Sequence, residues 1–197
     1  MKNKLKILAI SGSTRQASSN LLLIKEIEIL SSELFEIEVY DKLALLPHFN
    51  PDDDNELAPQ VIVDFRNTLR NAEGILICSP EYAMGVPGSL KNAIDWTVSS
   101  MEFSKKPVAL ITAGSVGEKA HSSLLGTLLI IEAKLSQHTQ LVISSVKSKV
   151  KDGKIIDEET LTNVLKLING LHDLITKEES DLSAPILQNN GLDGLTS

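Results

Sequence analysis

The sequence is poor in cysteine and in basic charge. Its single cysteine among 197 residues, Cys78, cannot form a disulfide within one chain. A chain of this length buries enough surface to fold without a disulfide or a metal, and a lone thiol is typical of a reducing compartment. The 19 basic residues are outnumbered by 26 acidic ones, which gives a net charge of −7. The lone cysteine therefore leads us to expect a cytoplasmic protein. Because no basic stripe is available to neutralise phosphates, we do not expect it to bind nucleic acid.

Long hydrophobic runs and recognisable catalytic sets are missing as well. The apolar stretch before Ser11 is too short for a signal peptide, and no run approaches the ~20 residues of a membrane span. The acidic stretch 52–54 is interpreted as a solvated loop, and Cys78 as an inert core residue. No serine–histidine–aspartate set is evident, and the four histidines lack the spacing of metal ligands (His48, His121, His138 and His172). We therefore expect no membrane contact and no metal, and any reaction would depend on a cofactor.

What the sequence does contain is a regular alternation of two kinds of segment. Apolar or alternating runs predict strands at 4–11, 35–40, 74–79, 107–113 and 141–146, and periodic segments predict helices at 20–32, 59–72, 87–99, 121–135 and 157–175. This alternation predicts an α/β fold with a doubly wound parallel sheet and helices on both faces. We expect the flavodoxin-like strand order 2-1-3-4-5, which places the alternating second strand at an edge.

These elements fill residues 1–176, which we interpret as one flavodoxin-like domain. Residues 177–197 lose periodicity, so they are predicted to form a tail that is loose or becomes ordered on a partner. The predicted helix at 121–135 has more apolar residues than the one stripe that packing on its own sheet requires. This surplus predicts a homodimer unless the tail covers it (Leu124, Leu125, Leu128, Leu129, Ile130 and Ile131).

Two unusual loops meet at the crevice between the first and third strands of this fold, where ligands bind. The first loop, residues 12–19, leads into a helix whose free N–H groups and dipole favour an anion. It lacks the glycine pattern of dinucleotide folds and the lysine of a P-loop. Its donor set fits a terminal phosphate, and the alternative is a polar loop with a capped helix (Ser13, Thr14, Arg15, Ser18, Ser19 and Asn20).

The second loop, residues 80–86, is stiff. Pro80 and Pro87 fix its ends, and Gly85 allows close approach or a positive φ. Such a loop can present backbone groups to a planar heterocycle without an ordering cost. We do not expect Glu81 to act as an acid or base, because no partner carboxylate or histidine has a suitable spacing. A third loop, residues 113–117, has small residues against which a flat ligand can lie, although glycine-rich turns end many strands.

Two motifs resemble signatures of the NADPH-dependent FMN reductase family. They are Gly12-Ser13-x-Arg15-x-x-Ser18-x-Asn20, and Pro80-Glu81-Tyr82 followed by Pro87-Gly88-x-Leu90-Lys91-Asn92-Ala93-Ile94-Asp95-Trp96. The resemblance covers about residues 4–175, and the family includes flavin-dependent quinone, azo-dye, chromate and ferric reductases. It implies an FMN-dependent oxidoreductase that passes a hydride from NADPH or NADH through FMN to a small acceptor, such as a quinone, an azo compound, a flavin or a metal oxyanion. Family members are commonly dimers or tetramers, which implies a homodimer or homotetramer here.

The resemblance also implies roles for individual residues. Ser13, Arg15, Ser18, Ser19 and Asn20 would hold the FMN phosphate, and Gly114 and Ser115 of the third loop would touch the flavin. The ring would lie against the second loop (Pro80, Glu81, Tyr82, Ala83 and Met84). No side chain needs to be catalytic, because the flavin N5 carries the chemistry. The family usually has asparagine where Ala83 stands and often Gly-Gly where Ala113-Gly114 stands, and these departures concern substrate and nucleotide preference more than FMN binding.

Other functions remain open from the sequence. Within the family, a narrower quinone reductase or a flavin supplier to a monooxygenase is an alternative. A flavodoxin-like electron carrier without its own NAD(P)H activity, or a ligand sensor that is not an enzyme, would use the same fold. Carriers tend to be strongly acidic near the flavin, whereas the loops here carry Arg15 and a single glutamate. Oxidation of NADPH in the presence of menadione separates the enzyme from the other two.

Overall fold

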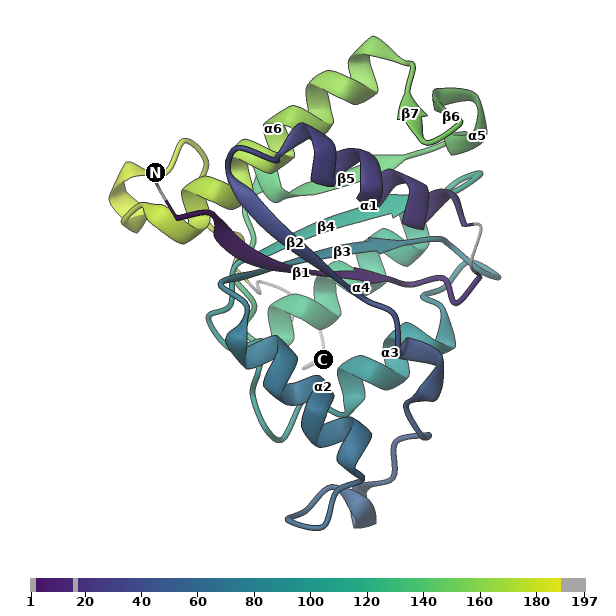
Figure 1. Ribbon diagram of the computed structural model, residues 1–197, viewed down its shortest axis with the longest axis vertical. Helices are drawn as coiled ribbons and strands as arrows, with labels where there is room; N and C mark the ends of the chain where they lie inside the picture. The colour runs from purple at the N-terminus through teal and green to yellow at the C-terminus, as the bar shows by residue number, and fades with distance from the viewer. Residues whose placement is uncertain (1–2, 16–17, 189–197) are drawn as a thin grey trace, which may run out of the picture.

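The protein is built around a sheet of five parallel strands. The computed structural model describes residues 3–15 and 18–188. The strands lie in the order β2-β1-β3-β4-β5, so the predicted order and the edge position of the second strand are confirmed (Figure 1). Their bounds are β1 Leu5–Ser11, β2 Phe35–Tyr40, β3 Gly74–Ser79, β4 Val108–Ala113 and β5 Gln140–Ile143.

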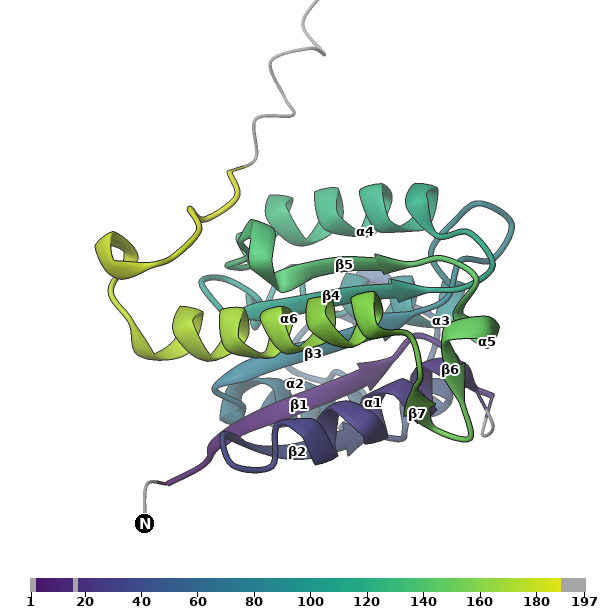
Figure 2. The same cartoon turned by 90° about the horizontal axis from the view of Figure 1, so that it is seen from above.

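Helices cover both faces of this sheet, as Figure 2 shows. Side chains alternate between the faces of a strand, and in β1 Leu8 and Ile10 join one apolar cluster while Ile7 and Ala9 join the other. The first cluster packs under α2 Gln60–Asn71, α3 Gly88–Asp95 and α4 Glu118–Ile130, and the second under α1 Ser19–Leu30 and α6 Glu158–Thr176. Burial on both faces explains why the central strands are apolar throughout. Among the described helices, none is long and apolar enough to cross a membrane.

The register brings the carboxyl ends of three strands together. Ser11 at the end of β1 lies opposite Cys78 in β3, and Ser79 lies opposite Thr112 in β4. The Gly12 amide continues the ladder by donating to the Cys78 carbonyl at 2.9 Å. The next strand in the sequence, β2, lies on one side of β1, and β3 lies on the other. The order of the strands therefore reverses between β1 and β3, and the loops after these two strands flank this switch point.

Two helices end earlier than their sequence periodicity predicts. The third helix was expected to reach about Ser99, but α3 ends at Asp95, and the following turns contain left-handed residues at Met101 and Lys105. The fourth was expected at 121–135, whereas α4 spans 118–130 because Gly117 starts it with φ 148° and Glu132 adopts φ 62° just after its end. The positive φ values at Gly117 and Glu132 bound α4, whereas Trp96 after α3 is right-handed; the apolar periodicity reports neither helix end.

The segment after β5 differs most from expectation. The fifth strand was predicted to reach residue 146, but it ends at Ile143, and a short helix, α5 Val146–Lys149, follows Ser145 in the left-handed region. A hairpin of β6 Val150–Lys151 and β7 Lys154–Ile155 comes next. Its turn is Asp152-Gly153, with φ 50° and 78°. Asp-Gly is a strong hairpin signal, so this element was detectable in the sequence.

Part of the carboxyl-terminal segment packs against the domain itself. Of residues 177–197, those up to 188 are described, and they include a 3₁₀ turn at Glu179–Asp181. Ile186 bridges to Ser136, and the Leu187 amide donates to the Leu135 carbonyl at 2.7 Å. The Leu187 side chain packs against the cluster under α2, α3 and α4. Residues 189–197 lie outside the described part of the chain.

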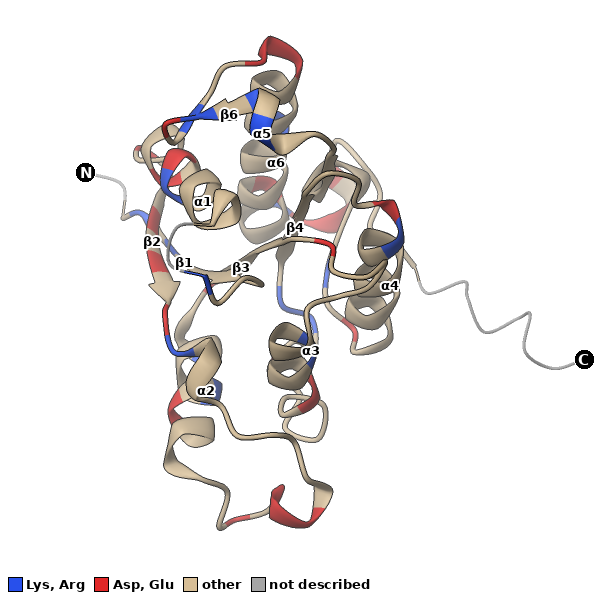
Figure 3. Ribbon diagram, turned by 90° about the vertical axis from the view of Figure 1, so that its right-hand side faces the viewer, with Lys and Arg blue, Asp and Glu red and all other residues tan. Residues whose placement is uncertain are grey.

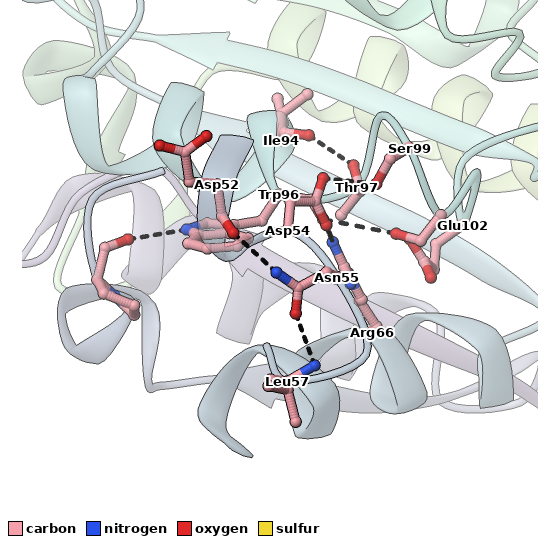
Figure 4. A network of polar contacts seen from close by, with 12 residues as sticks. Asp52, Asp54, Asn55, Leu57, Arg66, Ile94, Trp96, Thr97, Ser99 and Glu102 are labelled. Atoms are coloured by element: carbon pink, nitrogen blue, oxygen red, sulfur yellow. Dashed lines mark hydrogen bonds and ion pairs between the residues drawn. The ribbon is translucent and has the colours of Figure 1, made fainter. Parts of the chain in front are cut away.

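A buried ion pair ties the loop before α2 to the end of α3 (Figure 4). Arg66 of α2 pairs with Asp54 at 2.6 Å and donates to the Trp96 carbonyl through Nε at 2.8 Å. The second Asp54 oxygen accepts from the Ser99 hydroxyl at 2.6 Å. The expectation of a fully solvated stretch at 52–54 therefore holds for Asp52 and Asp53, which are exposed, and is wrong for Asp54.

Candidate functional site

A cavity of about 530 Å³ lies at the carboxyl ends of the strands. Ligand sites of proteins usually occupy ~300–1,000 Å³, so this volume suits a small molecule. Three loops contribute residues that the sequence predicted for the site: Ser13, Arg15, Ser18, Ser19 and Asn20 from the first, Pro80, Glu81 and Tyr82 from the second, and Gly114 and Ser115 from the third. A fourth loop, residues 145–148, completes the lining and was not predicted.

The first loop places polar groups at the start of α1. Ser18 is the N-cap, and its hydroxyl accepts from the Leu21 amide at 3.1 Å. The other amides of a first helical turn have no partner within the helix, so they are available to a ligand in the cavity. The turn before it is held by Ser11, whose hydroxyl donates to the Ser13 carbonyl at 3.1 Å. The helix start and Arg15 therefore present donors and positive charge to the same cavity.

A hydroxyl pair joins the first and second loops. The Ser13 and Tyr82 hydroxyl oxygens are 3.3 Å apart, and the Ser13 oxygen also accepts from the Arg15 amide at 3.3 Å. Tyr82 is itself half exposed at 54%. The pair spans the switch point between β1 and β3, and it sets the distance between the two loops on the side that is open to solvent.

The second loop contains a strained turn. The Tyr82 amide donates to the Gly85 carbonyl at 3.0 Å, and the Gly85 amide donates back at 2.9 Å. The two residues between them, Ala83 and Met84, have φ 49° and 62°. This is a type I′ turn, in which both central residues are left-handed. Of the two possibilities considered for Gly85, a positive φ is not realised, because Gly85 closes the turn and the left-handed residues are Ala83 and Met84.

Glu81 has a structural partner. Its carboxylate Oε2 accepts from the Ala120 amide at 2.9 Å, within the first turn of α4. A carboxylate at a helix start compensates free N–H groups and the helix dipole. The prediction that Glu81 is not an acid or base agrees with this role. The contact fixes the second loop against α4, so the side of the cavity formed by Glu81 is held rigidly.

Asn20 holds two strand ends together. Its side-chain amide donates to the Ala113 carbonyl at 3.2 Å, and its oxygen accepts from the Cys78 thiol at 3.2 Å. Burial raises the pKa of the Cys78 thiol far above its ordinary value, so this sulfur stays protonated, as expected of an inert core residue. Asn20 therefore uses its side chain mainly within the protein, although it lines the cavity.

Three predicted residues lie apart from the cavity. Ala83 and Met84 form the tip of the strained turn, and Met84 is 69% exposed. Thr14 lines a smaller space of about 140 Å³ on the other side of the first loop, together with Tyr40 and Asp41. The sequence did contain a sign of the fourth loop, the stretch 144–149, which is rich in serine and lysine. It was overlooked because half of it had been assigned to the predicted fifth strand.

Comparison with known proteins identifies the family. The family model described as NADPH-dependent FMN reductase matches residues 5–147. This chain belongs to the NADPH-dependent FMN reductase family. It is therefore an oxidoreductase that works with FMN and a nicotinamide nucleotide.

Relatives of this FMN reductase extend over most of the chain. An NAD(P)H-dependent FMN reductase of Pseudomonas aeruginosa is 32% identical over 165 residues, covering 81% of this chain and 89% of the relative. A quinone reductase of Escherichia coli is 26% identical over 185 residues, covering 90% and 98%. The solved structure of FerB, a flavoenzyme NAD(P)H:(acceptor) oxidoreductase from Paracoccus denitrificans, matches with a TM-score of 0.70 at 24% identity, covering 87% and 97%. This last likeness establishes the shared fold.

The residues that line the cavity suit the two ends of FMN. One end has a helix start, hydroxyls and Arg15, which suit a phosphate. The other end has Pro80, the Tyr82 backbone and Gly114, which suit a flat ring. The ideal Cβ position of Gly114 is 3.7 Å from the Glu81 amide nitrogen, so the second and third loops are close neighbours there. The residues present are therefore compatible with the group that the family binds.

A substitution at Ala83, in the strained turn, is expected to raise the free energy of unfolding. Asparagine tolerates the left-handed region better than alanine, so Ala83→Asn is expected to stabilise the fold by about 0.5–1 kcal/mol. Ala83→Val is the matched opposite, because a β-branched residue is strongly disfavoured at positive φ. Urea unfolding of the two variants and the wild type measures the effect. Equal stability of all three would contradict the strain assigned to this turn.

Proposed function

We propose that this FMN reductase transfers reducing equivalents from NADPH or NADH through FMN to a small organic acceptor, with a quinone as the favoured class. The observation that carries the proposal is the cavity in which the start of α1, with Arg15 and its serine hydroxyls, meets the loop at Pro80, Glu81 and Tyr82. The quinone class is supported by the name of the Escherichia coli relative, quinone reductase.

The residues of the cavity divide into two roles under this proposal. Ser13, Arg15, Ser18 and Ser19 bind the phosphate of FMN, and the first-turn amides of α1 add backbone donors. Pro80, Tyr82 and the 113–115 segment orient the ring. Bound FMN supplies hydride acceptance and donation, so the protein needs only to position it and to leave one side of the ring open.

The test of the function is an assay with each nucleotide. The purified protein, reconstituted with FMN, is expected to oxidise NADPH or NADH when menadione is present, and stopped-flow reduction with each nucleotide gives the preference. A protein that binds FMN but is reduced by neither nucleotide would be a carrier, which contradicts the proposal. A protein that binds no FMN would contradict both the enzyme and the carrier.

The phosphate site has its own prediction. Arg15→Ala is expected to weaken FMN binding about tenfold or more, because charge-assisted hydrogen bonds to phosphate are strong. Lys25→Ala is the matched control, since Lys25 is exposed on α1 and does not line the cavity. Fluorescence titration with FMN measures both. If Arg15→Ala retained FMN as well as the wild type, the phosphate assignment would fail.

We also propose that the protein forms a homodimer or homotetramer in the cytoplasm. On α4, Leu124 and Leu128 are buried, while Ile130 is 57% exposed. Val116, just before this helix, is 56% exposed, and Met84 of the neighbouring loop is exposed as well. These exposed apolar side chains are the surface that such an assembly would bury. Sedimentation of a monomer of 21.4 kDa would contradict the assembly.

A further inference from the structure

The fourth loop of the cavity carries a lysine to which no role has been given. Lys147 lies in α5 and lines the same cavity as Arg15 and Ser18. Figure 3 faces the carboxyl ends of the strands and shows the blue ribbon of α5 beside α1 and α6. The lysine therefore comes from a loop far along the chain from Arg15, and the fold brings both cations to one cavity.

Backbone contacts hold this loop in place. The Val146 amide donates to the Gly114 carbonyl at 3.0 Å, and the Ser145 amide donates to the Ser115 carbonyl at 3.2 Å. Gly114 follows Ala113, whose carbonyl accepts from the Asn20 side chain in the first turn of α1. A short series of contacts thus connects the start of α1 to the residue next to Lys147. The β6–β7 hairpin also reaches α1, since the ideal Cβ position of Gly153 is 3.7 Å from Leu22 Cδ2.

The two lysines of α5 differ in their surroundings. Hydrogen bonds from Thr160 lower the pKa of the Asp157 carboxyl, and the positive charge of Lys149 lowers it further. Lys149 therefore has an acidic neighbour. Lys147 is exposed, and it takes part in no ion pair among the described residues. Lys149 does not line the cavity. Of the two lysines of α5, Lys147 is therefore the one placed to meet a ligand in the cavity.

The charge of the expected ligand favours a second cation beside Arg15 and the helix start. A phosphate monoester carries about −1.5 to −2 at neutral pH, and Arg15 alone supplies +1. Glu81, the acidic residue of the lining, is engaged with the Ala120 amide. Given the proposed function, we infer that Lys147 is a second cationic contact for the FMN phosphate and gives the site a preference for phosphorylated flavin over riboflavin.

The experiment compares two flavins on four proteins. FMN and riboflavin are titrated into the wild type and into Lys147→Ala, Lys147→Arg and Lys149→Ala, with flavin fluorescence as the readout. Lys147→Ala is expected to weaken FMN binding about tenfold and to leave riboflavin binding unchanged. Lys147→Arg keeps the preference for FMN, and Lys149→Ala matches the wild type. The effect of Lys147→Ala on FMN also diminishes at high salt, because exposed charges are screened.

The outcomes that overturn the inference are distinct. Equal weakening of FMN and riboflavin would mean that Lys147 supports the loop and not the phosphate. Unchanged FMN binding in Lys147→Ala, with a raised KM for NADPH, would assign the lysine to the nucleotide. If the wild type bound neither flavin, the proposed function itself would fail, whereas tight FMN binding by both the wild type and Lys147→Ala would overturn only the role of the lysine.

Discussion

Replacing Gly12 by alanine is expected to destabilise the protein by about 2 kcal/mol and to weaken flavin binding. An ideal Cβ at this position would lie 2.4 Å from the Ser79 hydroxyl oxygen and 2.8 Å from the Ser79 Cβ. Neither distance is possible for real atoms, so the end of β1 must move away from β3. These two strand ends carry the first and second loops, and a shift between them changes the width of the cavity.

The control for Gly12→Ala is another glycine. Gly126 lies in α4, and no atom comes within 4 Å of its ideal Cβ. Gly126→Ala is expected to stabilise by about 0.5–1 kcal/mol, because alanine favours helix. Combining Gly12→Ala with Ser79→Gly removes the two shortest contacts and leaves the Leu90 Cδ2 atom at 3.1 Å. The double variant should therefore lose less stability than the sum of the two single losses. Additive losses in urea unfolding would show that the contact with Ser79 is not the cause.

Much of this site was predictable because apolar runs and loop chemistry are local features of the sequence, and the doubly wound topology supplies the strand order. Apolar runs predict buried strands, and the one alternating strand, Phe35–Tyr40, predicts the edge. The order then brings residues 12–20 and 80–82 to one crevice. Ten of the predicted residues line the cavity for this reason. Polar loops at a switch point thus carry most of the information about the ligand.

The errors have a different physical origin. The left-handed residues Ala83, Met84 and Ser145 depend on how the chain closes each turn, and neither alanine nor methionine signals a positive φ. The apolar pattern 141–146 continues past the end of β5, because Val146 is buried in α5 instead of in the sheet. Lys147 was missed in consequence. Side-chain pairs such as Arg66–Asp54 join positions that no periodicity connects.

The ion pair of Arg66 is the second position with a large expected effect. Arg66→Ala is expected to lower the free energy of unfolding by about 3 kcal/mol, because it leaves a shielded carboxylate without its cation. Arg66 is only 8% exposed, and the variant also removes both guanidinium donors to the Trp96 carbonyl, which keeps only the long contact from the Ser100 hydroxyl at 3.5 Å. Lys91→Ala is the control, since the exposed Lys91–Asp95 pair on α3 is expected to contribute under about 0.5 kcal/mol. Similar losses in the two variants would contradict the role of burial.

The same pair predicts how stability depends on pH. Burial alone would raise the pKa of Asp54, but hydrogen bonds from Ser99 and Arg66 outweigh it and lower this pKa below its usual value. A carboxyl with a lowered folded pKa contributes stability that is present above its unfolded pKa, about 3.9, and lost as the pH falls through the folded pKa. Asp54→Asn removes this contribution. The difference in free energy of unfolding between the wild type and Asp54→Asn should therefore shrink as the pH falls from 5 to more acidic values. Urea unfolding across this range measures the difference, and a constant gap would mean that Asp54 is not the titrating group.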